Sequence, residues 1–379
     1  MSGSRTTVIA SVEFPTYVGG IGTQAYELAR HWQAMGEGVV AVVRLNGEQD
    51  LAFDQRQTFR TIRVKEDGRK LGKFWVRLRA LRQAIAETNA SGIYASDWRA
   101  GLVAYLATWG RIPYVVALYG SEFTDTHRGR AEAMMQRFVM RRAKRVISIS
   151  RYTTDLAIRN GAPPDRTVVI AVGSDPDRFV PNPDGDAAKR RFGFEGRRVI
   201  LAVGRLVKRK GHETVLRAMP AILAAVPDAL YAIVGTGSEK PELARSVAEL
   251  GIEKHVRFMG KIPDDDLAAV YAAADVFVLT GSNDVRLGIE GFGIVFLDAG
   301  CCEIPVVGGR TGGIIDAIED GETGLLVDPD SAEETAAAVI RLLQDPDLAK
   351  QMGQAARRRV LRDFTWRRVA ERTLEAIYE

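Results

Sequence analysis

The amino-acid sequence predicts an α/β protein of two doubly wound domains, each built on a parallel sheet. Three observations support this fold class. Short apolar stretches alternate with helical patterns along the whole chain. Each half opens with a strand, a glycine-containing turn and a helix. The chain has 379 residues, which exceeds what one hydrophobic core usually fills.

The first half begins with the apolar stretch Thr7 to Val12, which predicts a strand. The turn Val18-Gly19-Gly20-Ile21-Gly22 follows it, and a helical pattern then runs from Gln24 to Ala34. Further strands are expected at residues 38–43, 114–118, 146–150 and 168–172. We assign residues 1–180 to a first Rossmann-like domain.

The second half repeats this plan. A strand is expected at residues 199–203, a turn at 204–211 and a helix at 212–225. Later strands are expected at residues 230–234, 276–279 and 306–307. Residues 173–196 are rich in Pro, Asp, Gly and Asn, which predicts the linker. The second domain is assigned to residues 190–364, and we expect the ligand cleft between the two domains, at the carboxyl ends of their strands.

Composition indicates an ordinary soluble globular protein. No run of 18 apolar residues occurs, and residues 1–5 lack the apolar block of a signal peptide. We therefore expect a cytoplasmic protein. The only cysteines, Cys301 and Cys302, are adjacent, which argues against a structural disulfide and cannot supply a metal cluster.

Positive charge is concentrated in the first half. Residues 1–190 hold 28 Lys and Arg against 19 Asp and Glu, whereas the remainder holds 24 against 29. Within residues 69–85, basic side chains accompany Leu71, Phe74, Leu78, Leu81 and Ile85 at helical spacing. Two interpretations stay open: a helix on an anionic membrane surface at the inner face, or a sheet-covering helix with a solvated basic face. Nucleic acid is not expected, because no aromatic platform accompanies the charge.

Residues 290–298 combine two carboxylates, two glycines and an apolar run. Gly291 and Gly293 are expected to open a helix, whose free backbone N–H groups attract phosphate. Glu290 and Asp298 flank that phosphate position, and ionised carboxylates accept hydrogen bonds from sugar hydroxyls. This segment predicts a sugar-phosphate site.

A basic turn follows the first strand of the second half. It runs Gly204-Arg205-Leu206-Val207-Lys208-Arg209-Lys210-Gly211. Arg205 offers a bidentate fork and Lys210 a point charge, so together they suit a diphosphate and the negative charge that grows on it as it leaves. Glycines at 235, 237, 312 and 313 follow other expected strands.

These motifs, in this order and spacing, closely resemble the family 4 retaining glycosyltransferases of GT-B architecture. The resemblance spans nearly the whole chain, from Gly19-Gly20 through the basic turn and Phe258-Met259-Gly260 to the 290–298 segment and Gly312-Gly313. Residues 365–379 resemble the closing helix of the family, which crosses back onto the first domain. The resemblance implies transfer of a sugar from a nucleoside diphosphate donor to an acceptor hydroxyl with retention.

The resemblance also implies roles for particular residues. Glu290, Arg205, Lys210 and Tyr119 would be the catalytic set. Donor binding would involve Glu290 at the sugar hydroxyls, Asp298 at the ribose, and Arg205 and Lys210 at the diphosphate. The remaining donor contacts implied are Gly20 at the diphosphate, Gly237, Ile262 near the base, and the backbone of Gly293, Ile294 and Val295.

Two positions depart from the family pattern. Asp298 stands where a second glutamate is usual, so ribose binding would need a closer backbone or a bridging water. Tyr119 stands where a histidine is usual, and a phenol does not serve as a base at neutral pH. His127 lies near Tyr119 in the sequence as an alternative.

The predicted activity needs neither a cofactor nor a metal ion, because cationic side chains would neutralise the leaving diphosphate. The donor base, guanosine or uridine, stays open, as does the acceptor, which could be a glycan, a lipid-linked sugar or a small hydroxyl compound. Two alternatives are a nucleotide-sugar epimerase of GT-B type and a catalytically silent protein that binds nucleotide sugar or membrane. A nicotinamide dehydrogenase is a weaker third, since no Gly-x-Gly-x-x-Gly turn with a downstream acid is convincing.

Overall fold

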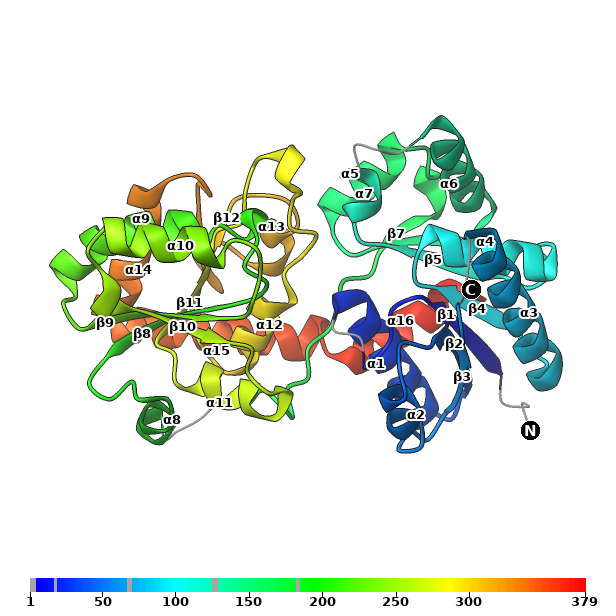
Figure 1. Ribbon diagram of the computed structural model, residues 1–379, viewed down its shortest axis with the longest axis horizontal. Coiled ribbons are helices and arrows are strands. Elements are labelled where there is room, and N and C mark those ends of the chain that lie inside the picture. Colours follow the sequence, from blue (N-terminus) through cyan, green and yellow to red (C-terminus); the bar gives the residue numbers. More distant parts are fainter. Residues whose placement is uncertain (1–4, 17–18, 67–69, 125–128, 182–184) are drawn as a thin grey trace. The chain divides into compact units, whose positions relative to one another are not determined.

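The computed structural model describes residues 5–16, 19–66, 70–124, 129–181 and 185–379. The chain divides into two compact units (Figure 1). Unit 1 comprises residues 1–173 and 366–379, and unit 2 comprises residues 174–365. Each unit is built on a sheet whose paired strands are all parallel, with helices on both faces. The predicted fold class, two doubly wound Rossmann-like units, is therefore confirmed.

Unit 1 contains a seven-stranded sheet in the order β3-β2-β1-β4-β5-β6-β7. Its strands are β1 (Thr6–Ser11), β2 (Gly38–Arg44), β3 (Arg60–Val64), β4 (Gly92–Ala95), β5 (Tyr114–Leu118), β6 (Arg145–Ser148) and β7 (Thr167–Val169). Its helices are α1 (Gly20–Ala34), α2 (Gln49–Asp54), α3 (Lys70–Thr88), α4 (Trp98–Thr108), α5 (Ser121–Thr124), α6 (Arg130–Arg142), α7 (Arg151–Arg159) and α16 (Trp366–Tyr378).

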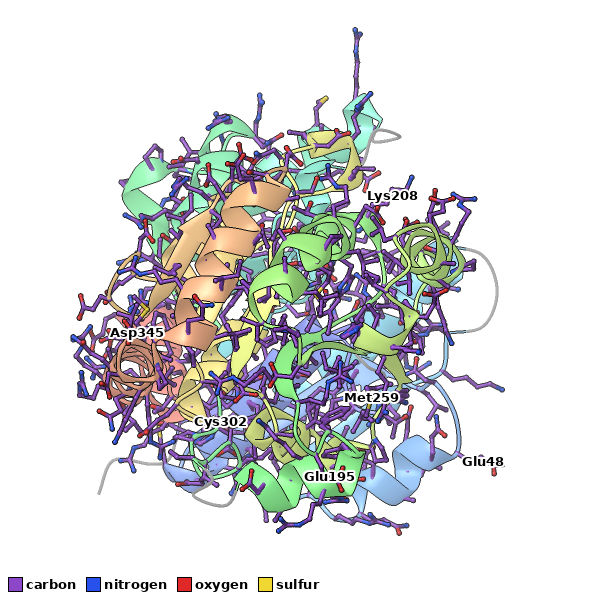
Figure 2. All side chains as sticks on the ribbon, turned by 90° about the vertical axis from the view of Figure 1, so that its left-hand side faces the viewer. Glu48, Glu195, Lys208, Met259, Cys302 and Asp345 are labelled. Atoms are coloured by element: carbon purple, nitrogen blue, oxygen red, sulfur yellow. The ribbon has the colours of Figure 1, made fainter. Side chains whose placement is uncertain are left out.

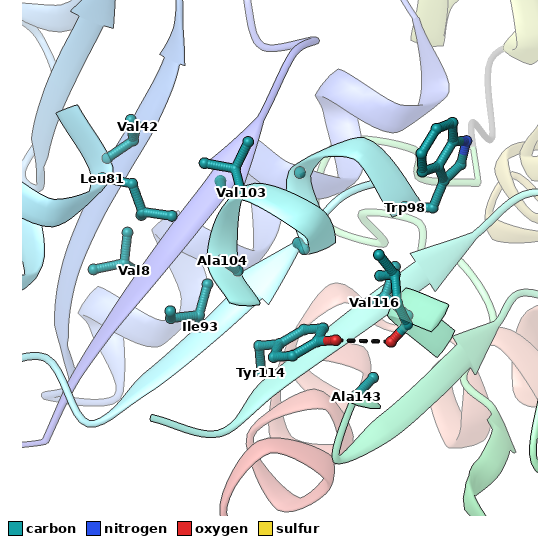
Figure 3. Packing of buried hydrophobic residues seen from close by; sticks show 14 of the residues in the cluster. Val8, Val42, Leu81, Ile93, Trp98, Val103, Ala104, Tyr114, Val116 and Ala143 are labelled. Atoms are coloured by element: carbon teal, nitrogen blue, oxygen red, sulfur yellow. Dashed lines mark hydrogen bonds between the residues drawn. The ribbon is translucent and has the colours of Figure 1, made fainter. Parts of the chain in front are cut away.

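Alternate residues of these strands face two helix layers. Val8, Ile93 and Val116 point toward the layer of α3, α4 and α6, and form the core drawn in Figure 3. In that core the Tyr114 hydroxyl donates to the Val139 carbonyl oxygen at 2.7 Å, which satisfies a buried polar group. On the other face α16 packs against α1, and the Trp32 indole N–H donates to the Ala370 carbonyl oxygen at 2.9 Å.

Unit 2 contains a six-stranded sheet in the order β10-β9-β8-β11-β12-β13. Its strands are β8 (Arg198–Val203), β9 (Ala229–Val234), β10 (Val256–Gly260), β11 (Val276–Leu279), β12 (Val306–Gly309) and β13 (Gly324–Val327). Its helices are α8 (Gly185–Phe192), α9 (His212–Ala225), α10 (Lys240–Glu249), α11 (Leu267–Ala272), α12 (Ile294–Cys301), α13 (Ile314–Ala317), α14 (Ala332–Gln344) and α15 (Pro346–Asp363). Strands β8, β9 and β11 are apolar and buried along most of their length, as both-face coverage requires.

Several expected elements differ from the observed ones. The strand expected at residues 146–150 ends at Ser148, because Ser150 caps α7 through a capping box with Thr153. The segment predicted as a linker contains helix α8, which packs against α11. Strands β3, β4, β10 and β13 were not expected from the sequence.

Candidate functional site

Two loops meet at the carboxyl edge of the unit 2 sheet, where the neighbouring strands β8 and β11 end. The Gly281 backbone N–H donates to the Lys210 carbonyl oxygen at 3.3 Å, and Thr280 Oγ1 donates to the Gly211 carbonyl oxygen at 3.1 Å. A Cβ on Gly211 would lie 2.1 Å from Thr280 Oγ1, and its φ is +74°. Glycine at this position therefore allows the basic turn to contact the loop that leads to Glu290.

The structure brings the predicted site residues Lys210 and Glu290 together. Lys210 Nζ lies 2.7 Å from Glu290 Oε2, and Arg209 Nη1 lies 3.7 Å from the same oxygen. Only 9% of Glu290 is exposed. Burial acts to raise the pKa of Glu290, but Lys210, Arg209 and Arg205 outweigh it and hold this pKa below its usual value.

The geometry of this ion pair leaves hydrogen-bonding capacity on Glu290. Although Oε2 is close to Lys210 Nζ, it makes no hydrogen bond of ordinary geometry to any described residue. The 2.7 Å contact is thus an ion pair whose direction of approach is poor for a hydrogen bond. A buried, ionised carboxylate with a free lone pair is suited to accept from a ligand hydroxyl.

Helix α12 begins at Ile294, four positions after Glu290. Gly293 is its N-cap, with φ of +92° and no side-chain cap. A Cβ on Gly293 would lie 2.7 Å from the Phe296 ring, so the tight approach requires glycine. Ile294 and Val295, whose backbones were predicted to contact sugar and phosphate, form the half-buried first turn. Their N–H groups belong to the orphan donors at a helix start.

Gly312 and Gly313, the glycine pair that follows β12, contact the segment that carries Glu290. The Gly313 backbone N–H donates to the Glu290 carbonyl oxygen at 2.9 Å. A Cβ on Gly313 would lie 1.9 Å from the Gly291 carbonyl oxygen, and Gly312 has φ of +54°. These glycines therefore fix the backbone that carries Glu290.

Arg205, Gly237 and Ile262 also lie at the carboxyl edge of the unit 2 sheet, after β8, β9 and β10 respectively. Arg205 is exposed, and Ile262 is half-buried. A Cβ on Gly237 would lie 2.2 Å from the Leu206 carbonyl oxygen, so Gly237 contacts the basic turn directly. In Figure 2, Lys208 of the same turn is labelled at the upper right, and Cys302, in the segment before β12, is labelled at the lower left.

Asp298 has different surroundings from Glu290. It is 7% exposed on the second turn of α12, and its Oδ1 accepts from Ser174 Oγ at 2.6 Å. Burial raises the pKa of Asp298 to about 7, although Ser174 and Arg178 act in the opposite direction. Its partner is thus a neutral hydroxyl rather than the basic turn.

Two further predicted residues belong to unit 1. Gly20 is the first residue of α1, and a Cβ placed there would meet nothing within 4 Å. Tyr119 follows β5, and its hydroxyl lies 3.2 Å from that of Tyr94. Burial, with Tyr94 nearby, raises the pKa of Tyr119 well above its ordinary value, which opposes any role as a base. Residues 17 and 18 of the predicted glycine turn, and His127, lie outside the described residues.

Sequence reasoning did not assign roles to Arg209 or Ser174. Arg209 stands inside the basic turn, and its position next to Lys210 was the available signal. Ser174 lies 124 positions from Asp298, so no local pattern could have linked the two.

The described segments contain no grouping of three or more His, Cys, Asp or Glu side chains able to hold a metal ion. None of their helices combines the length and the apolar content needed to cross a membrane. Cys301 and Cys302 are both free and buried.

Comparison with known proteins identifies the family. Residues 19–173 match the family model "Glycosyl transferase 4-like domain", and residues 185–359 match "Glycosyl transferases group 1". The GDP-mannose-dependent α-(1-6)-phosphatidylinositol monomannoside mannosyltransferase of Mycolicibacterium smegmatis is 39% identical over 234 residues, which are 61% of each chain. The chain thus aligns with less than two thirds of that relative.

Two other proteins extend the comparison. The D-inositol 3-phosphate glycosyltransferase of Corynebacterium glutamicum strain R is 31% identical over 306 residues, which cover 76% of this chain and 71% of that one. The crystal structure of Anabaena HepE in complex with UDP and glucose covers 98% of both chains, with a TM-score of 0.82 and 21% identity, and therefore supports the fold. The chain belongs to the family 4 glycosyltransferases of GT-B architecture.

Proposed function

We propose that this protein transfers a mannosyl group from GDP-mannose to a hydroxyl of an inositol-containing glycolipid, with retention at the anomeric carbon. The guanosine donor is chosen because the Mycolicibacterium relative is named as GDP-mannose-dependent. The inositol part of the acceptor follows from the names of both relatives, one a phosphatidylinositol monomannoside mannosyltransferase and the other an inositol 3-phosphate glycosyltransferase, and the lipid part follows from the first name alone. Retention follows from the family resemblance.

One observation carries the proposal. Glu290 is a buried carboxylate held ionised by Lys210 and Arg209, four positions before the start of α12. This arrangement provides an acceptor for sugar hydroxyls beside cations and helix N–H groups that suit a diphosphate.

The proposed reaction needs one bond to break and one to form. The bond between the anomeric carbon and the β-phosphate oxygen breaks, and GDP departs with that electron pair. The acceptor oxygen bonds to the same face of the carbon, and its proton passes to the departing phosphate oxygen. Arg205 and Lys210 stabilise the charge on the diphosphate, and Glu290 orients the sugar.

In this scheme a phosphate oxygen replaces Glu290 as the partner of Lys210 when the donor binds. Glu290 is then available to the sugar hydroxyls, while Arg209 remains beside it. The four cations of the basic turn supply the positive charge that a divalent ion supplies in other transferases, so we propose that no metal or cofactor is required. Asp298 is assigned to the ribose, and Gly20, Gly237, Ile262 and Tyr119 keep their roles as predictions.

A lipid-linked acceptor would place the enzyme at a membrane, and α3 supports this. Leu71 and Trp75 are 72% and 59% exposed on this helix, and Val76 is also exposed. Leu78 and Leu81, further along the same helix, are buried in the unit 1 core, whereas Leu71, Trp75 and Val76 take no part in that core. Residue 69, the first of the predicted basic helix, lies outside the described residues.

Helix α6 of the same unit has a similar exposed face. Met134 and Phe138 are 72% and 39% exposed, and Arg137 and Arg141 are exposed beside them. Apolar side chains flanked by arginines suit the interface of an anionic bilayer. We therefore propose a cytoplasmic enzyme bound peripherally at the inner face of the membrane. Sedimentation with vesicles should increase with anionic lipid and fall with salt, and binding that ignores both would contradict this location.

The transfer reaction is tested with purified full-length protein, GDP-mannose and a phosphatidylinositol monomannoside acceptor. We expect mannosylated lipid whose new linkage has the α configuration of the donor, and a much lower rate with UDP-glucose. Chelation by EDTA should leave the rate unchanged. A product of inverted configuration, or transfer that depends on a divalent ion, would contradict the mechanism.

The two alternatives, a nucleotide-sugar epimerase and a catalytically silent binding protein, are not favoured, because the relatives are named as transferases. An epimerase would convert the nucleotide sugar without any acceptor. A silent binding protein would bind GDP and give no product with any donor and acceptor. The same assay, run with and without acceptor, distinguishes these outcomes.

A further inference from the structure

A buried histidine adjoins the basic turn and has no role in the mechanism above. His212 is the first residue of α9, two positions after Lys210, and is only 3% exposed. Its Nδ1 lies 3.0 Å from the hydroxyl of Tyr231 on β9, which is fully buried. Buried polar groups in proteins are nearly always hydrogen-bonded, so the second ring nitrogen also calls for a partner.

The available partner is the backbone of the basic turn. His212 Nε2 is buried without a hydrogen bond of ordinary geometry to any described residue. The Arg205 backbone nevertheless acts on the imidazole and raises its pKa, against the larger effect of burial. The imidazole is thus fixed at one nitrogen by a hydroxyl on β9, and its other nitrogen is left for the basic turn.

We propose that His212 is a positioning residue for the diphosphate-binding turn. Its Nδ1 accepts a hydrogen bond from the Tyr231 hydroxyl, and its Nε2 donates to the Arg205 carbonyl oxygen. The inference rests on the proposed function, because the turn is assigned to the diphosphate there.

The surroundings explain why an imidazole fits this role. Burial, together with the nearby charge of Lys210, lowers the pKa of His212 to about 4. The ring is therefore neutral at physiological pH and carries one N–H, so it can accept at one end and donate at the other. A lysine or arginine here would add a buried cation beside Lys210 and could not accept from Tyr231.

The rest of the turn is anchored to its neighbours at other points, whereas the Arg205 carbonyl oxygen accepts only within the turn among the described residues, from the Val207 N–H at 2.9 Å, and its second lone pair can take the His212 donor. The Gly204 N–H donates to Val234 and the Leu206 N–H donates to Thr236, on the side of β9. The Lys210 carbonyl oxygen accepts from Gly281 on the side of β11. Because the Arg205 side chain is exposed, the direction of its guanidinium depends on how its backbone is held.

The ring contacts are tested first on the full wild-type chain by ¹⁵N NMR of its histidine rings at pH 7. We expect His212 to show the tautomer protonated at Nε2, with signals that move when GDP is added. The tautomer protonated at Nδ1 would overturn the proposal, and this result does not depend on activity or on any variant.

Two variants test the consequence. His212→Asn removes the link to Arg205, and Tyr231→Phe removes only the hydroxyl that orients the ring. We expect the Kd for GDP and the KM for the donor to rise about tenfold in the first and about threefold in the second, with kcat changed less than threefold. His31→Asn, in unit 1, is the control and should bind GDP as the wild type does.

A purely structural histidine would give a different result. Both variants would then lose thermal stability and active fraction, so that kcat would fall while the GDP affinity of the folded protein stayed at the wild-type value, and the proposal would be wrong. If His212→Asn does not fold, Tyr231→Phe and the ring tautomer decide. Failure of the wild type to bind GDP would instead contradict the proposed function, and the tautomer alone would then decide the role of His212.

Discussion

Glu290 and Asp298 lie eight residues apart at the two ends of one loop and helix segment, yet their environments differ in kind. Two cations lie within 4 Å of Glu290, and its pKa is held below the usual value. Asp298 is bonded to one neutral hydroxyl, and burial raises its pKa to about 7. Two acidic residues that resemble each other in the sequence therefore have pKa values shifted in opposite directions.

This difference teaches that neighbours distant in sequence determine what each carboxylate can do. Glu290 depends on a turn 80 positions earlier, and Asp298 on Ser174 at the first position of unit 2. The ionised group suits hydroxyl recognition, whereas the partly protonated group can both donate and accept. Four substitutions test the comparison.

The largest effect is expected from Glu290→Gln, which keeps the shape and removes the charge. The sugar loses its anionic acceptor, so we predict that kcat falls about 10²- to 10³-fold, as when one preorganised polar contact to the reacting group is lost. GDP affinity, measured by calorimetry, should stay within about threefold. Glu249→Gln, on the exposed face of α10, should leave both quantities unchanged, and full activity of Glu290→Gln would remove its proposed role.

Lys210→Met should act mainly on the diphosphate. A charge-assisted contact contributes about 1.5–3 kcal/mol, so we expect the Kd for GDP to rise roughly 10- to 100-fold. The variant should also be less stable, because Glu290 loses its closer cation. Adding Glu290→Gln to Lys210→Met should recover part of that stability in urea unfolding. Additive losses in the double variant would show that the two residues are not coupled.

Asp298→Asn should change the pH dependence of stability. The folded-state pKa of about 7 lies above the ordinary value of 3.8, so the folded protein binds an extra proton between these limits. Stability contributed by this group is fully present below about pH 4, falls as pH rises, and is lost above about pH 7. We expect Asp298→Asn to lack a decline on the order of 4 kcal/mol across this window, measured against wild type by urea unfolding. Parallel pH profiles would contradict the raised pKa.

Ser174→Ala should have the smallest effect. It removes the hydroxyl that donates to Asp298 and that accepts from Cys301 Sγ at 3.5 Å, so we predict a loss of about 1 kcal/mol in the free energy of unfolding. The pKa of Asp298 should rise further, because Ser174 acts to lower it. Carboxyl ¹³C NMR measures this shift, with Ser246→Ala on α10 as the control. A fall in the pKa would contradict the assigned hydrogen bond.

Much of the fold could be predicted because both sheets are covered by helices. Their strands are apolar along their length, and β5, β11 and helix α9 match the expected ranges. β3 was missed because it reads Arg-Thr-Ile-Arg-Val and is only partly buried, so it lacks this signal. β4 and β13 are apolar, but each has four residues and opens on glycine, which leaves a run of three apolar residues. Helix α8 was hidden in a segment whose Pro, Gly and Asp content indicates a linker.

The site was predictable where one loop carries the chemistry, and not where distant segments meet. Glu290 and the basic turn could be found because charged residues and glycines follow apolar strands. The contact of Lys210 with Glu290, and that of Ser174 with Asp298, depend on tertiary packing that no local pattern encodes. The same holds for the hydrogen bond between His212 and Tyr231.

The central claim is that Lys210 moves from Glu290 to the diphosphate when the donor binds. A crystal structure of the full chain with GDP-mannose tests it most directly. We predict that Lys210 Nζ and Arg205 contact phosphate oxygens, and that Glu290 accepts from hydroxyls of the mannose. A donor bound with the Lys210 to Glu290 pair intact and its phosphates elsewhere would contradict the account.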